Sequence, residues 1–85
     1  MDNDQLFQMA DGLTASLDAR GHMEAAERLR EGKGLLNGLT DGWALFLEAI
    51  DAVLSSQGGR LGPSDIKVLR ALRGAVRKRV HGKRF

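Results

Sequence analysis

The chain of 85 residues contains no cysteine, no tyrosine and only one proline. The absence of cysteine excludes disulfide bonds, thiolate metal ligands and a cysteine nucleophile, and it fits a reducing compartment. No basic segment followed by an apolar one opens the sequence, so we expect no signal peptide and a cytoplasmic location. The longest nearly apolar run, residues 43–54, is too short for a bilayer, so we expect no transmembrane segment.

Aromatic residues make up only 5% of the chain, and β-branched residues are few. Leucine and alanine are frequent, and this composition favours helices over strands. A chain of this length makes one domain with a modest core, which a partner could help to stabilise. We therefore predict a single all-α domain over residues 1–85.

The most apolar stretch lies between residues 40 and 57. Within it, Trp43, Phe46, Ile50 and Val53 recur at helical spacing, and the polar residues fall on one narrow seam. A helix that is apolar around most of its circumference must be covered by several neighbours. We expect this helix to be the centre of a bundle, with Trp43 as an anchor in the core.

Capping residues and glycines divide the chain into four predicted helices, over residues 4–19, 22–37, 41–57 and 64–81. Asp2 and Gln5 have the spacing of a capping box at the first helix. Gly21 is placed to end that helix, and Ser64 to cap the fourth. Short loops make sequential helices antiparallel, so the fold predicted is a small up-down-up-down four-helix bundle.

The end of the second helix has two candidate positions. The apolar stripe continues through Gly32 to Leu36, and Asn37 followed by Gly38 is a strong stop signal. An earlier break is the alternative, because Gly32 and Gly34 each weaken a helix by about 1 kcal/mol relative to alanine. We favour the break at Asn37 and Gly38, with Gly32 at a close approach to another helix.

Charge is divided unevenly along the chain. Residues 1–57 carry ten acidic and four basic side chains, whereas residues 58–85 carry nine basic side chains and one acidic side chain. This division indicates either ion pairing within the bundle or an acidic partner for the C-terminal third.

The basic residues of the fourth helix and its tail are the candidate residues for binding a polyanion or a partner: Lys67, Arg70, Arg73, Arg77, Lys78 and Arg84. In one interpretation they contact phosphate groups, with little sequence specificity because Phe85 is the only stacking residue beside them. A membrane surface or an acidic protein would be other targets. In the interpretation that we favour, the arginines pair with acids of the first three helices. Residues 81–85 are expected to form a disordered basic tail.

No catalytic site, metal site or cofactor site is predicted. His22 and His81 lie on different helices without a serine or an acid at a useful spacing. Glu48 and Asp51 are one turn apart, and we expect them to be solvated or paired with the fourth helix. No glycine-rich phosphate loop occurs.

These observations predict a non-enzymatic helical binding or interaction module. Its partner would be another protein or a second copy of the chain, giving a homodimer. The alternative function is nucleic-acid binding, in which the basic C-terminal helix contacts phosphates.

Overall fold

Four α-helices make up the structure, a computed structural model that describes residues 2–36 and 41–81. They are α1 (Asn3–Ala19), α2 (Met23–Gly34), α3 (Gly42–Gln57) and α4 (Pro63–His81). No strand occurs in the described part of the chain. The prediction of an all-α four-helix bundle is therefore confirmed. No helix in these two ranges is long and apolar enough to cross a membrane.

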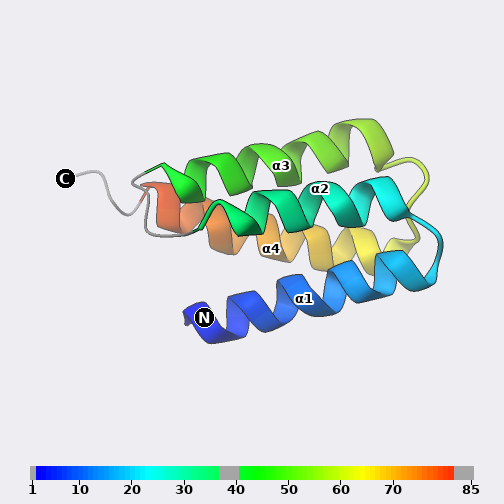
Figure 1. The fold of residues 1–85 in the computed structure, drawn as a ribbon, viewed down its shortest axis with the longest axis horizontal. Helices are drawn as coiled ribbons and strands as arrows, with labels where there is room; N and C mark the ends of the chain where they lie inside the picture. The colour runs from blue at the N-terminus through cyan, green and yellow to red at the C-terminus, as the bar shows by residue number, and fades with distance from the viewer. Residues whose placement is uncertain (1, 37–40, 82–85) are drawn as a thin grey trace.

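The helices run alternately in opposite directions around one core (Figure 1). Helices α1 and α3 each pack against both α2 and α4. The bundle therefore has α1 and α3 on one diagonal and α2 and α4 on the other. As a result, α4 lies between α1 and α3 and turns its remaining side outward.

Two of the predicted capping signals are confirmed, and the third is shifted. The Gln5 backbone N–H donates to Asp2 Oδ1 (2.8 Å) and the Asp2 N–H donates to Gln5 Oε1 (3.1 Å), which closes the capping box of α1. Gly21 ends α1 at a positive φ of 82°. Pro63 is the first residue of α4, so Ser64 lies inside the first turn and not at the N-cap. The fixed φ of proline suits this first helical position.

The end of α2 agrees with the alternative break at Gly32 and Gly34 and not with the favoured one. The helix ends at Gly34, three residues before the expected end. The N–H groups of Leu35 and of the residue after it bond to carbonyls three residues back (3.2 and 3.0 Å), which tightens the last turn. A Cβ atom built on Gly42 would lie 2.6 Å from the Leu35 carbonyl oxygen, so the chain here is packed against the start of α3. The predicted stop at Asn37 and Gly38 lies outside the described residues.

The core draws fully buried side chains from all four helices: Leu6, Leu17, Leu29, Phe46, Ile50, Val53, Leu69, Leu72 and Val76. Gly32 is buried where α2 meets α3, and a Cβ atom built on it would lie 2.6 Å from Ala49 Cβ. The close approach predicted for Gly32 is therefore confirmed, and it lets these two helices pack tightly.

Trp43 lies at the edge of this core, where it is only half-buried. Its ring stacks on Phe7 of α1, with ring centroids 6.1 Å apart and planes 5° from parallel. Arg79 of α4 lies over the Trp43 ring (5.3 Å), and Lys33 of α2 lies over the Phe7 ring (5.5 Å). This arrangement, which we call the aromatic stack, joins all four helices at the end of the bundle where α1 begins.

Candidate functional site

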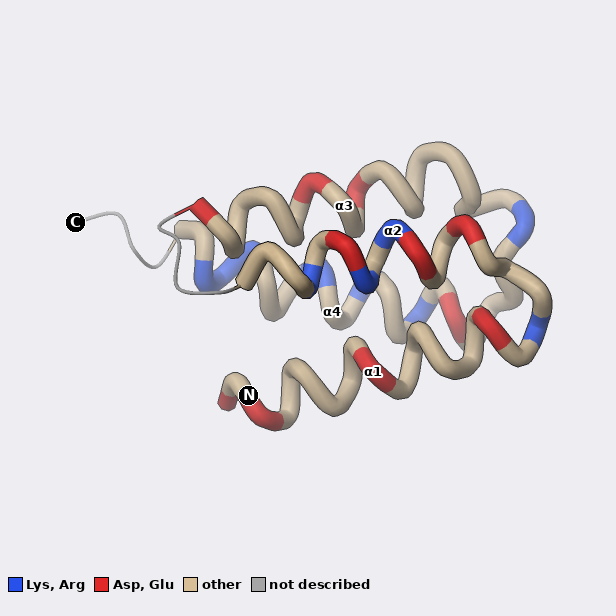
Figure 2. Tube along the Cα trace, viewed as in Figure 1, with Lys and Arg blue, Asp and Glu red and all other residues tan. Residues whose placement is uncertain are grey.

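Basic residues recur along α4 (Figure 2). Lys67, Arg70, Arg77 and Lys78 are exposed, as are the small residues Ala71 and Gly74 between them. At about 100° per residue, these six side-chain positions fall within one arc of the helix. We call this surface the basic face. Of the other predicted site residues, Arg73 lies at its border with α3, and Arg84 lies outside the described residues.

Ion pairing divides the predicted site residues into two groups. The Arg73 Nε atom donates to Asp51 Oδ1 of α3 (2.5 Å), so the pairing expected from the sequence is present here. Lys67, Arg70, Arg77 and Lys78 form no ion pair or side-chain hydrogen bond with any described residue. Four of the candidate residues therefore keep their charge available to an external anion.

Two of the three acids of α1 are engaged away from the basic face. Helix α1 holds three acidic residues and no basic residue, and two of these acids pair with basic residues of α2. Lys33 Nζ donates to Asp11 Oδ1 (2.5 Å), and Arg30 pairs with Asp18. Since α4 holds six basic residues and one acidic residue, its positive charge is left largely uncompensated.

The one acidic residue of α4 is on the opposite side of the helix from the basic face. Asp65 is 3% exposed, and its Oδ1 atom accepts a hydrogen bond from Ser16 Oγ of α1 (3.0 Å). The Arg20 Nε atom lies 3.6 Å from Asp65 Oδ2 and is the nearest cation to it. Asp65 thus joins the start of α4 to the end of α1 and does not reduce the charge of the basic face.

A groove of about 290 Å³ crosses the basic face, lined by Arg70, Ala71, Gly74, Ala75, Lys78 and Arg79. A Cβ atom built on Gly74 would meet nothing within 4 Å, so the floor of the groove is open. Arg70 and Lys78 stand one on each side of Gly74 along the helix. An anionic group could therefore approach the backbone closely between two cations.

Arg79 forms a fixed edge of this groove. Its Nε atom donates to Asn3 Oδ1 of α1 (2.8 Å), and Nη1 donates to the Ala75 carbonyl oxygen (3.1 Å). At about 100° per residue, Arg79 falls on the same side of α4 as the buried Leu72 and Val76, and it is not among the predicted site residues. A basic residue among the apolar positions of a helix can cover an aromatic ring of a neighbouring helix. This pattern, with Trp43 as the ring, is the signal that could have identified Arg79.

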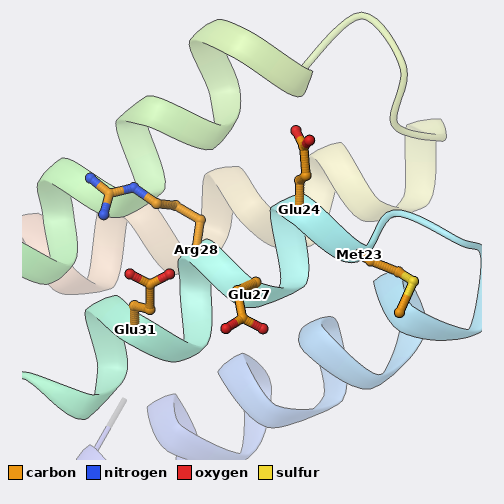
Figure 3. Close-up of a pocket in the computed structure, with 5 residues that line it drawn as sticks. All are labelled: Met23, Glu24, Glu27, Arg28 and Glu31. Atoms are coloured by element: carbon orange, nitrogen blue, oxygen red, sulfur yellow. The ribbon is translucent and has the colours of Figure 1, made fainter.

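The surface of α2 has a different character. A hollow of about 420 Å³ on it is lined by Met23, Glu24, Glu27, Arg28 and Glu31 (Figure 3). The figure shows the side chains of Glu24 and Glu27 pointing in different directions, so these carboxylates do not converge. Because α2 and α4 are diagonal in the bundle, this acidic surface and the basic face look away from each other.

Among the described residues, the two histidines and the carboxylates of α3 are not brought together for chemistry. His22 precedes α2 and His81 ends α4, so the two histidines are at opposite ends of the bundle (Figure 1). Within residues 2–36 and 41–81, no three histidine, aspartate or glutamate side chains are grouped as a metal ion would require. Asp51 pairs with Arg73, which leaves Glu48 alone and exposed on α3.

Compared with protein-family models, with curated proteins and with solved structures, the chain matches none of them. The function must therefore be argued from the site alone.

Proposed function

We propose that this protein is a non-enzymatic helical interaction module that binds nucleic acid through phosphate contacts of the basic face. The observation that carries this proposal is the set of exposed, unpaired cations on α4, with no acidic residue among them. Lysine and arginine side chains that neutralise phosphates supply most of the affinity of sequence-independent nucleic-acid binding. The hollow on the diagonal helix α2, with three glutamates and one arginine, would orient the basic face toward the phosphates.

The chemistry of the basic face favours phosphates over a membrane or an apolar protein interface. A helix that lies on a membrane inserts large apolar side chains, and the centre of a protein interface is rich in aromatic anchors. The basic face has only Ala71 and Gly74 between its cations. The large hydrophobic residues that are exposed in the described part of the chain are Met23 and Leu35, which belong to α2 and its C-cap.

Self-association is the second candidate function, and the charge distribution favours it. The acidic surface of α2 in one copy is complementary to the basic face of another copy. Such a contact joins different surfaces, so the copies would be related head to tail and not by a two-fold axis. It would compete with nucleic acid for the same cations.

Fluorescence anisotropy of a labelled DNA at several salt concentrations tests the proposal. Log affinity should fall linearly with log salt, by about 0.9 for each phosphate contact on duplex DNA. Replacing Arg70 and Arg77 by glutamine should weaken binding and reduce that slope by about two units. The matched control replaces Arg28 and Arg30 by glutamine, which removes the same charge from α2, the helix diagonal to α4.

The two double variants separate a binding face from a general charge effect. The control should lose much less affinity, because its cations lie on α2 and not on the basic face. Equal losses would show that binding depends on net charge alone and would refute the proposal. So would a parent protein that fails to bind DNA at low salt.

A further inference from the structure

We infer that the nucleic acid is double-stranded, and that the basic face bridges the phosphates of its two strands. This inference rests on the proposed function and names the partner more narrowly. Three features of the described residues support it: the arrangement of the cations around the helix, the open floor between them, and the contacts that the aromatic rings already make.

At about 100° per residue, the cations of the basic face form two pairs around the helix, Arg70 with Arg77 and Lys67 with Lys78. The two pairs are about 80° apart, and Gly74 lies between them. The major groove of duplex DNA is about 12 Å wide and admits an α-helix. A helix that lies in this groove therefore turns one pair of cations toward each of the two strands that border it.

The floor between the pairs allows the helix to enter such a groove. Ala71 has only a methyl group and Gly74 has no side chain, and the space above Gly74 is empty. These residues also carry no side-chain donor or acceptor that could read the edge of a base. The contact should therefore depend on the shape and phosphates of the duplex and not on its sequence.

The contacts of the aromatic rings favour a duplex over a single strand of nucleic acid. Proteins that bind single strands usually stack successive bases on exposed aromatic side chains. Phe7 and Trp43 already stack on each other and each lies under a cation, while Phe46 is fully buried. No phenylalanine or tryptophan ring in residues 2–36 and 41–81 is left free to stack on a base.

The test compares a labelled DNA duplex of two helical turns, about 20 base pairs, with one of its own strands. We expect the duplex to bind at least about tenfold more tightly, and a duplex of unrelated sequence to bind within about twofold of the first. Gly74→Leu fills the floor without changing charge, and it should weaken duplex binding about tenfold while leaving single-strand binding unchanged.

Gly12→Leu is the matched control for the variant at Gly74. Gly12 is also an exposed glycine inside a helix with nothing near its absent Cβ, but it lies on α1. This variant should bind both DNA forms as the parent does, and circular dichroism should show both variants folded.

The outcomes separate the two proposals. A single strand that binds as tightly as the duplex overturns the inference and leaves the proposed function standing. Duplex binding that is unchanged in Gly74→Leu has the same consequence. A parent protein that binds neither DNA form overturns both.

Discussion

Replacing Gly32 by alanine tests the contact between α2 and α3. The new Cβ atom would lie 2.6 Å from Ala49 Cβ and 3.0 Å from Phe46 Cδ1. Neither neighbour can move away easily, because Ala49 Cβ is fixed to the backbone of α3 and Phe46 is fully buried. The two helices must therefore separate, or the Phe46 ring must leave its preferred position.

The magnitude follows from two opposing effects. Alanine raises helix propensity over glycine by about 1 kcal/mol. Overpacking of a tight interior costs about 1–3 kcal/mol, and rigid neighbours place this site in the upper part of that range. We expect Gly32→Ala to lower the free energy of unfolding by about 1–2 kcal/mol, as the difference of these two effects. Urea unfolding followed by circular dichroism measures this as a lower midpoint at an unchanged slope.

Two other helical glycines supply the control. Neither Gly12 nor Gly74 would bring a Cβ atom within 4 Å of another group. Their alanine variants should therefore gain about 0.5–1 kcal/mol of stability. If Gly32→Ala is as stable as Gly74→Ala, the helices do not approach each other as described, and the reasoning is refuted.

Three further predictions concern the core, a buried carboxylate and self-association. Phe46→Ala should cost about 3–5 kcal/mol in urea melts, and Trp43→Ala should cost less because Trp43 is half-buried; equal losses would contradict this ranking. Arg20→Gln leaves the Asp65 carboxylate without its cation, so it should lower the free energy of unfolding by about 1–3 kcal/mol. The control Arg60→Gln, at an exposed site, should change that free energy by less than about 0.5 kcal/mol. Head-to-tail association should appear in sedimentation at low salt and vanish at high salt, and a monomer at every concentration and salt would exclude it.

The helices could be predicted because their signals are local. The capping box of Asp2 and Gln5, the glycine at position 21 and the apolar periodicity act within a few residues. Local signals left two possible ends for α2 and could not decide between them, since the end at Gly34 depends on how Leu35 packs against the start of α3. The position of Trp43 at the edge of the core depends in the same way on where the bundle ends.

The candidate site could be predicted only as a set of residues. The sequence identified the basic residues of α4, but it could not show which of them are paired. That depends on the arrangement of the bundle, in which Arg73 faces Asp51 while Lys33 of α2 engages Asp11 of α1. The role of Arg79 was missed for the same reason, because its partners come from α1 and α3.

The aromatic stack gives the protein an optical reporter of its own. Trp43 is the only tryptophan, and the chain has no tyrosine, so all indole emission comes from one ring. Arg79 covers that ring and also lines the groove of the basic face. An anion bound in the groove would lie beside Arg79 and so change the quenching of Trp43. Occupancy of the basic face could then be followed by the intrinsic fluorescence of the unlabelled protein.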